Sequence, residues 1–299
     1  MCLYPRLIRN KKYTLNNKNK GIIPELKDER AQFVPVGCGK CIECLMKKKR
    51  EWQVRLNEEI KHSKNRLFVT LTFSNESLIK LEKVAKIKKY DDDIDNAIAT
   101  YAIRHYFERI RKETGKSAKH WLITELGHQN TERIHLHGII FHDNIELITD
   151  KWKMYGNIYI GEFVNEKTVN YIIKYCTKMD IDHKGYIPKI LCSKGIGKQY
   201  LLRGKEYNKF NDSKTREFYR LPNGNKVAML IYYRNNIYSG EEREKLWMNM
   251  LDKNVRYVRG IKVDISENED EYYKLLEQER INNIQLGIVT GKQIGRAHV

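Results

Sequence analysis

The chain has 299 residues, of which 41% are hydrophobic and 10% aromatic, enough to bury the core of one domain with extensions or of two domains. It is strongly basic, because 56 Lys and Arg residues stand against 38 Asp and Glu and give a formal net charge of +18. A surface this basic attracts polyanions, so nucleic acid is the expected partner. The sequence contains no run of about eighteen apolar residues, which argues against a membrane-spanning helix.

The two ends of the chain carry signals about processing. Residues 1–5 (MCLYP) lack the apolar stretch of a signal peptide, so we expect the protein to stay in the compartment where it is made. In that setting the six cysteines are expected to be thiols or metal ligands rather than disulfides. Residues 293–299 (QIGRAHV) resemble the translation of a common sequencing adapter. We expect an artefact there, a missing natural C-terminus and an assembled environmental source.

The first half of the chain begins with a basic, weakly periodic stretch over residues 1–50 that is typical of a partly extended arm. Apolar residues four apart predict a helix over 47–62. The β-branched and aromatic run at 67–73 predicts a buried strand, and a helical period predicts a helix over 96–112. Three more strands and one helix are predicted at 121–126, 134–141, 157–163 and 168–178.

This order of elements predicts an α+β fold with a central antiparallel sheet backed by helices. Beyond residue 178 the patterns are weaker. They indicate a strand at 227–233 and helices at 241–251 and 272–282.

Two histidines lie two positions apart on the strand predicted at 134–141. Side chains of a strand alternate between its faces, so His135 and His137 point the same way. Paired imidazoles on a rigid strand suit Mg²⁺, Mn²⁺ or a softer divalent ion. We choose Glu125, on the preceding strand, as the third ligand because the connection between the strands is short. The same pattern also fits two ordinary half-buried histidines.

The helix predicted at 168–178 presents a second group of reactive side chains. At about 100° per residue, Tyr171, Lys174, Tyr175 and Lys178 share one arc of about 100°, and the apolar residues between them take the opposite face. A phenol with a pKa near 10 is a poor nucleophile until a neighbouring cation favours its deprotonation. The helix is therefore a candidate nucleophile segment, although amphipathic surface helices are also common.

Together these features resemble the HUH endonuclease superfamily, in its two-tyrosine class of rolling-circle replication initiators. Residues 67–75 are similar to that family's first motif, Glu125 with 135–137 to its second, and the tyrosine helix to its third. Residues 1–5, the cysteine motif at 38–44 and the stretch 193–197 resemble initiators of the gokushovirus group of microviruses (Microviridae). The resemblance covers roughly residues 1–235. Ile134 and Leu126 depart from the family's usual Pro and Tyr at positions that carry no chemistry.

The resemblance implies an organisation for the whole chain. Residues 63–235 would form the HUH endonuclease domain, with a split βαβ, ferredoxin-like sheet. Residues 1–62 would be a basic N-terminal extension with the cysteine cluster and a helix. Residues 236–292 would be a partly helical C-terminal extension, followed by the adapter-like residues 293–299.

The resemblance also implies a metal-dependent, site-specific DNA endonuclease and strand transferase. One tyrosine, assisted by Mg²⁺ or Mn²⁺, would attack single-stranded DNA at a viral replication origin and leave a 5′-phosphotyrosine link and a 3′-OH primer. The second tyrosine would allow strands to be exchanged and rejoined. A host polymerase would extend the primer. No ATPase P-loop motif occurs, so a host helicase would unwind the DNA, in the cytoplasm of a bacterial cell.

Three cysteines at three-residue spacing, Cys38, Cys41 and Cys44, indicate a structural zinc site, because C-x-x-C supplies one side of a zinc tetrahedron. We expect Cys2 to be the fourth ligand, with His62 in reserve. Reduced structural thiols are the alternative.

A basic run follows the cysteines directly. Positive charge for phosphates and an aromatic ring for base stacking suit single-stranded DNA. The run would equally fit the solvated start of a helix. The candidate DNA-binding residues are Lys47, Lys48, Lys49, Arg50 and Trp52.

Two other functions fit parts of the sequence. An HUH relaxase or transposase is the nearest enzyme, but relaxases usually carry a third histidine and small HUH transposases a lone tyrosine. A non-catalytic, zinc-dependent nucleic-acid-binding protein would explain the charge and the cysteines. It would leave the histidine pair and the tyrosine helix without a role.

Overall fold

The computed structural model describes residues 2–17, 19–88, 93–127, 132–178, 183, 186–204, 209–211, 214–221 and 223–288, with only the backbone at 87–88, 210–211 and 214. The chain divides into two compact units, Lys48–Arg203 and Met1–Lys47 with Gly204–Val299. The adapter-like residues 293–299 lie outside the described part. Among the described helices, none is both long enough and apolar enough to cross a membrane.

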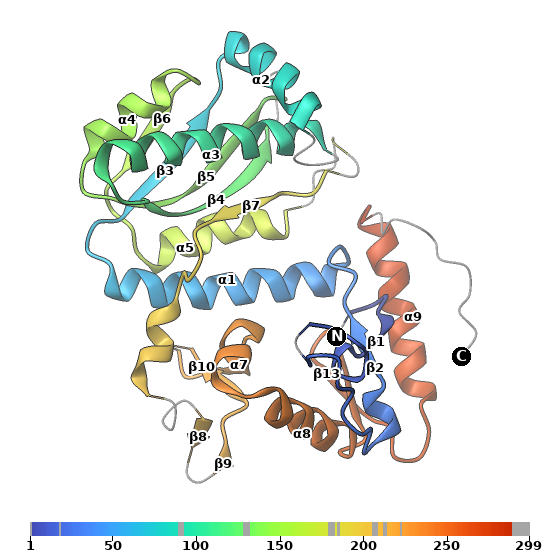
Figure 1. Cartoon of the computed structure of the whole chain (residues 1–299). Helices are drawn as coiled ribbons and strands as arrows, with labels where there is room; N and C mark the ends of the chain where they lie inside the picture. The colour runs from blue at the N-terminus through green and yellow to red at the C-terminus, as the bar shows by residue number, and fades with distance from the viewer. Residues whose placement is uncertain are drawn as a thin grey trace. The chain divides into compact units, whose positions relative to one another are not determined.

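A five-stranded sheet in the order β6-β3-β5-β4-β7 forms the centre of the unit Lys48–Arg203 (Figure 1). All four strand pairs are antiparallel, which confirms the predicted α+β class. Four strands lie where the sequence predicted them, with shifted ends. The three-residue edge strand β7 is too short to produce a periodic signal. The strands are β3 (Leu67–Thr72), β4 (Lys119–Leu126), β5 (Ile134–Phe141), β6 (Ile158–Gly161) and β7 (Ile190–Cys192).

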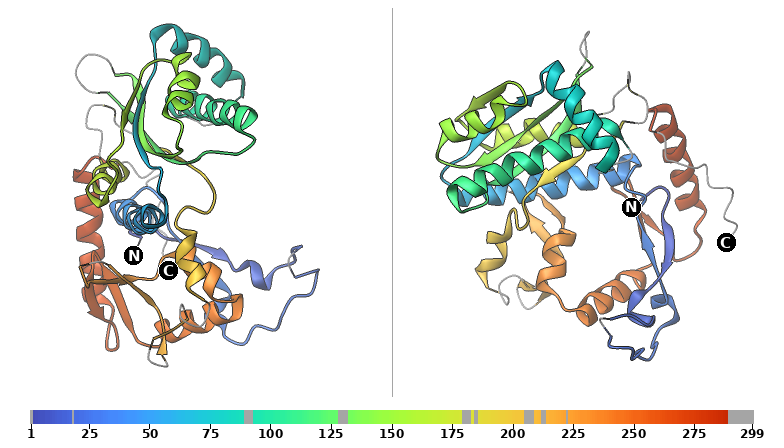
Figure 2. Two further views of the ribbon diagram at one scale, coloured as in Figure 1. Left: turned by 90° about the vertical axis from the view of Figure 1, so that its left-hand side faces the viewer. Right: turned by 45° about the horizontal axis from the view of Figure 1, so that its top comes forward.

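Each face of the sheet has its own apolar core, and the helices beside it can be followed in Figure 2. One face packs against α2 (Asn75–Lys88), α3 (Ile94–Thr114) and α4 (Ile145–Lys153). The other packs against α1 (Ile42–His62) and α5 (Glu166–Ile172). Because strand residues alternate between faces, Leu136 faces the first core and its neighbours His135 and His137 face the α5 side.

Two helices were absent from the sequence prediction. In α2, Leu81 and Ala85 are the buried apolar residues among many lysines, so its periodicity is weak. The nine-residue α4 begins at Asn144, whose side chain accepts a hydrogen bond from the Leu147 backbone N–H. A polar cap of this kind starts a short helix without a long apolar pattern. The predicted run of consecutive strands is therefore interrupted between β5 and β6.

The prediction of one α-helix over 168–178 is wrong at its C-terminal end. The α-helix α5 ends at Ile172, and a 3₁₀ segment, η3 (Ile173–Cys176), follows it. Thr177 closes this turn, because its backbone N–H and its hydroxyl both donate to the Lys174 carbonyl. Lys178 therefore lies beyond the helix, in a direction that a regular helical projection does not predict.

The second unit contains the paired N-terminal strands β1 (Arg6–Arg9) and β2 (Phe33–Val36), so the expected arm is partly a β-ribbon. The strand predicted at 227–233 is wrong beyond Ala228, because Tyr233 and Ile237 are buried four residues apart on a helix. The helices predicted at 241–251 and 272–282 are present. The C-terminal elements are β8 (Phe210–Asn211), β9 (Lys214–Thr215), β10 (Phe218–Arg220), β11 (Lys226–Ala228), α7 (Ile231–Ile237), α8 (Gly240–Leu251), β12 (Val255–Val258), β13 (Ile261–Asp264) and α9 (Asp270–Gln285).

Both ends of the chain contribute to one small core in this unit. Leu3 and Ile42 pack with residues of the β12–β13 hairpin and of α9. The Ile42 backbone N–H donates to the Asn283 side chain, which is fully buried. The first residues, the start of α1 and the last described helix are thus held together. The apolar residues of this core are Leu3, Cys41, Ile42, Val258, Val263, Tyr272 and Leu276.

Candidate functional site

Polar side chains form two rows across the sheet on the face toward α5. Glu125, His135 and Thr72 are cross-strand neighbours in one row, and Thr70 is paired with His137 in the next. Paired residues of antiparallel strands point to the same face, so the register alone brings these five side chains together. Next to them, a side chain on Gly138 would overlap the Trp121 carbonyl, so glycine lets β5 approach β4 closely.

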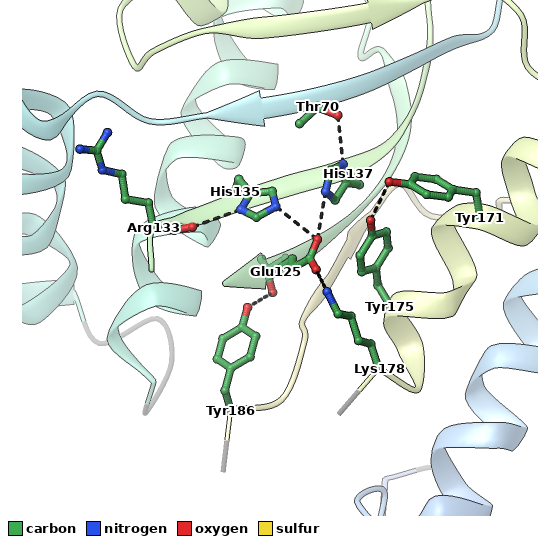
Figure 3. A network of polar contacts seen from close by, with 10 residues as sticks. Thr70, Glu125, Arg133, His135, His137, Tyr171, Tyr175, Lys178 and Tyr186 are labelled. Carbon is green, nitrogen blue, oxygen red and sulfur yellow. Dashed lines mark hydrogen bonds and ion pairs between the residues drawn. The ribbon is translucent and has the colours of Figure 1, made fainter. Parts of the chain in front are cut away.

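The three predicted metal ligands converge on one oxygen atom (Figure 3). Glu125 Oε2 lies 3.2 Å from His135 Nε2 and 3.0 Å from His137 Nε2. Glu125 and His137 are each 8% exposed, so the group is largely shielded from solvent. Their arrangement could hold a metal ion, because the ligand atoms all lie within 4.8 Å of one another.

The outer nitrogens of both imidazoles have partners of their own. His135 Nδ1 lies 3.1 Å from the Arg133 carbonyl, and His137 Nδ1 lies 3.0 Å from Thr70 Oγ1. A carbonyl only accepts, so His135 Nδ1 carries a hydrogen and Nε2 of the neutral ring carries a lone pair. A lone pair facing a carboxylate oxygen favours a proton or a metal cation between them. Two such imidazoles and a carboxylate fit a divalent ion.

Lys178 binds the other oxygen of the same carboxylate. Its ammonium group donates to Glu125 Oε1 and forms an ion pair with it. Burial alone would raise the pKa of Glu125, but hydrogen bonds from His135, His137 and Lys178 hold that pKa well below its usual range. The carboxylate is therefore ionised. Lys178 contacts a predicted metal ligand rather than standing only beside the tyrosines, as the regular helix had suggested.

The two tyrosines lie in contact but in different surroundings. The Tyr175 hydroxyl donates to the Tyr171 hydroxyl over 2.9 Å, and the Tyr175 ring stacks on His137 with centroids 4.8 Å apart. Tyr171 is 44% exposed, whereas Tyr175 is 9% exposed. Burial raises the pKa of Tyr175, and its hydrogen bond to Tyr171 and the charge of Glu125 raise it further. Lys174 is exposed, with its ammonium 6.0 Å from the Tyr171 ring centroid.

Two residues beside the site were not singled out from the sequence. Thr70 contacts His137 Nδ1, and the Phe68 ring stacks near the His137 ring at 6.4 Å between centroids. Both point to the α5 face from β3. The alternation of residues 67–72 could have placed them on one face, but pairing between β3 and β5 cannot be read from local sequence.

The four predicted zinc ligands lie together in the second unit. Cys2, Cys38, Cys41 and Cys44 have sulfurs within 4.8 Å of one another. Tetrahedral zinc with bonds of about 2.3 Å needs sulfurs about 3.8 Å apart. The sulfurs of Cys2 and Cys41 are 3.8 Å apart, which fits that geometry. The reserve ligand His62 is wrong, because it ends α1 about five turns beyond Cys44.

Backbone N–H groups surround this cysteine cluster and point at its sulfurs. The N–H groups of Cys38 and Tyr4 donate to Cys2 Sγ at 3.2 and 3.3 Å, and that of Cys41 donates to Cys38 Sγ at 3.3 Å. Hydrogen bonds from Cys41 and Cys44 lower the pKa of Cys2 to about 3. Donors of this kind stabilise thiolates, the form in which cysteine binds metal.

The candidate DNA-binding run lies at the start of α1. Lys47 and Arg50 are exposed, whereas Lys48 is partly buried and its burial lowers its pKa. Trp52 packs on Trp121 with centroids 5.8 Å apart, and the Arg55 guanidinium lies 4.1 Å from its ring centroid. The Trp52 ring thus contributes to the core on the α5 side, and a base could stack on the Arg55 side only by displacing that guanidinium.

Comparisons with known proteins agree with these motifs. The family model of the replication-associated protein ORF2 matches residues 66–180, which include the sheet residues of the site and η3. The replication-associated protein VP4 of Bdellovibrio phage phiMH2K is 27% identical over 239 residues, 71% of this chain and 69% of the relative. No solved structure matches the chain. The chain thus resembles the replication-associated proteins of microviruses, as its motifs had indicated.

Proposed function

We propose that the protein initiates rolling-circle replication of a small viral DNA genome by nicking single-stranded origin DNA, as a metal-dependent HUH endonuclease and strand transferase. The observation that carries this proposal is the convergence of His135, His137 and Glu125 on one point, with Tyr171 and Tyr175 beside it. The names of the matched family and relative support a role in viral DNA replication and DNA as the partner.

The residues around the site suit a hard divalent ion with open positions. Mg²⁺ or Mn²⁺ held by Glu125, His135 and His137 would polarise the scissile phosphate and offset its growing charge. Thr70 and the Arg133 carbonyl hold the rings in place through Nδ1, and Lys178 holds the carboxylate through Oε1. Such outer contacts orient the ligands before substrate arrives.

Tyr171 is the better placed first nucleophile, because its hydroxyl is the more exposed and accepts a hydrogen bond from Tyr175. Its oxygen forms a bond to phosphorus while the bond from phosphorus to the 3′ oxygen of the preceding nucleotide breaks. The phenol proton passes to solvent, and the departing 3′ oxygen takes up a proton. One phosphodiester replaces another, so the step is reversible and the strands can later be rejoined.

Tyr175 has two roles in this scheme. Its O–H group stabilises negative charge on the Tyr171 oxygen during the first attack, through the hydrogen bond already formed. Its own buried oxygen then serves the second cleavage, when the regenerated origin returns. Lys174 supplies positive charge beside Tyr171 for the phosphate.

The remaining predictions become parts of the same proposal. The sheet unit would be the HUH domain, and the cysteine cluster a structural zinc site outside it. The basic residues Lys47–Arg50 would contact phosphates of the strand. A host polymerase and helicase would act with the protein in the cytoplasm of a bacterial cell.

The test is covalent capture of DNA. The protein is incubated with Mn²⁺ and a single-stranded library with a randomised centre, and adducts that survive denaturant are sequenced. We expect adducts that require the metal, are abolished in the Tyr171→Phe/Tyr175→Phe double variant and are reduced more by Tyr171→Phe than by Tyr175→Phe. Tyr257→Phe, an exposed tyrosine on β12, is the matched control.

Two outcomes would contradict the proposal. Adducts that persist in the double variant would place the nucleophile elsewhere. DNA binding without any adduct would favour a non-catalytic nucleic-acid-binding protein.

A further inference from the structure

A cavity of about 740 Å³ opens at the ends of β3, β4 and β5, next to two of the proposed metal ligands. This volume lies within the range of small-molecule binding sites. Its rim carries polar groups from three connections of the sheet unit. The polar lining side chains are Thr72, Ser74, Asn75, Arg133 and Asn157, with Glu125 and His135 at the inner end.

The cavity and the tyrosines lie on opposite sides of the metal ligands. Glu125 and His135 line the cavity, whereas His137 is the ligand that contacts the tyrosine rings, at 4.8 Å from Tyr175 and 6.3 Å from Tyr171. Figure 3 shows the same arrangement, with Arg133 on one side of the carboxylate and both tyrosines on the other.

Three polar side chains at the cavity are available to a ligand. The guanidinium of Arg133 and the amides of Asn75 and Asn157 are exposed, and none has a hydrogen bond or ion pair with another described residue. The main chain of Asn157 is nevertheless fixed, because its carbonyl accepts from the Thr72 N–H at 2.9 Å and from the Thr72 hydroxyl at 3.1 Å.

The stereochemistry of phosphoryl transfer gives this arrangement a direction. In a displacement at phosphorus, the attacking and leaving oxygens stand roughly in line on opposite sides. If a tyrosine attacks from its side of the metal ligands, the leaving 3′ oxygen points toward the cavity. The nucleotide that carries this oxygen then extends into it.

We propose that this cavity binds the nucleotide immediately 5′ of the nick, the one whose 3′ oxygen leaves. Arg133 binds the phosphate on the 5′ side of that nucleotide, because a guanidinium matches phosphate oxygens. Asn75 and Asn157 read its base, because an amide offers both a donor and an acceptor to a base edge. The cavity thereby keeps the freed 3′-OH end beside the phosphotyrosine for rejoining. This inference rests on the proposed nicking function.

The test combines sequence preference with strand release. Adducts formed on the randomised library by the wild type and by Asn75→Ala/Asn157→Ala are sequenced. We expect the double variant to lose about tenfold of its preference at the position 5′ of the nick and to keep its preference on the 3′ side. For Arg133→Gln we expect a fluorescent 5′ fragment to leave the adduct about tenfold faster. Arg111→Gln, on the exposed side of α3, is the control.

Failure of this inference is distinguishable from failure of the proposed function. If the wild type forms no adduct, the nicking function is wrong and the cavity assignment with it. If adducts form but the preference 5′ of the nick and the fragment release are unchanged in the variants, the cavity assignment alone is wrong. A change confined to the 3′ side of the nick would overturn the proposed polarity.

Discussion

The two groups of candidate metal ligands are built in different ways. The first stands on adjacent strands of one sheet, with two nitrogens and one carboxylate beside a cavity. The second joins Cys2 to three cysteines at the start of α1, with backbone N–H groups directed at the sulfurs. One is a part of a regular sheet, and the other holds distant segments of the chain together.

The difference predicts opposite uses of a metal. Three ligands leave coordination positions open for substrate, whereas four cysteines fill a zinc tetrahedron and leave none. The sheet site should therefore exchange its ion readily and act in catalysis. The cysteine cluster should retain its ion and stabilise the fold around it. Each prediction below would break or sharpen this contrast.

The largest effect is expected from removing a ligand of the sheet site. His137→Ala should lower the rate of adduct formation on the order of 10³-fold, because a metal's stabilisation of the transition state is worth several kcal/mol. Salt-sensitive DNA binding should remain. Quantified adducts and binding by fluorescence anisotropy are the measurements, and His105→Ala, an exposed position on α3, is the control. Loss of binding together with nicking would make His137 a structural residue.

A cysteine variant should instead affect stability. Cys41→Ser should remove bound zinc and lower the free energy of unfolding by about 3 kcal/mol, since binding to a structural site contributes directly to folding. Metal analysis and urea unfolding measure the two effects. Cys192→Ser, an exposed thiol outside the cluster, should change neither. A wild-type protein that binds no zinc would show the cysteines to be reduced thiols, and the contrast between the two groups would fail.

The sequence predicted positions best where neighbours are local. The period of a strand and a short connection were enough to bring Glu125 to the two histidines. Its spacing also predicted the buried face of the tyrosine segment, where Ile172, Ile173 and Cys176 are buried. The contact between Lys178 and Glu125 could not be predicted, because it depends on the change from α to 3₁₀ geometry.

Pairing between distant strands was the second limit. Thr70 reaches His137 only because β3 pairs with β5, and the sequence between them includes two helices. The cavity depends on the same packing, since its lining comes from the ends of several strands. Short polar-capped helices such as α4 were the third limit, because nine residues give little periodicity.

A smaller effect tests the support of the sheet site. Thr70→Val keeps the shape of the side chain but removes the hydroxyl at His137 Nδ1. We expect the Mn²⁺ concentration for half-maximal adduct formation to rise about tenfold, the lower end for loss of an outer contact to a metal ligand. The maximal rate at saturating metal should change less. Thr114→Val, whose hydroxyl bonds within its own helix end, is the control, and an equal metal requirement would remove Thr70 from the site.

The smallest effect separates acid sensitivity of the sheet unit from loss of metal. His120 belongs to neither ligand group and stacks on Phe107 at 3.6 Å, and burial lowers its pKa to about 4. The unfolded chain takes up this proton below about 6.5, so folding loses stability as pH falls from there toward 4. In EDTA, His120→Gln should lose about 1 kcal/mol less than the wild type between pH 7 and pH 5. Urea midpoints at both pH values measure this, with His105→Gln as control. An unchanged pH dependence would move the acid sensitivity to other groups and leave the comparison of the two metal sites untouched.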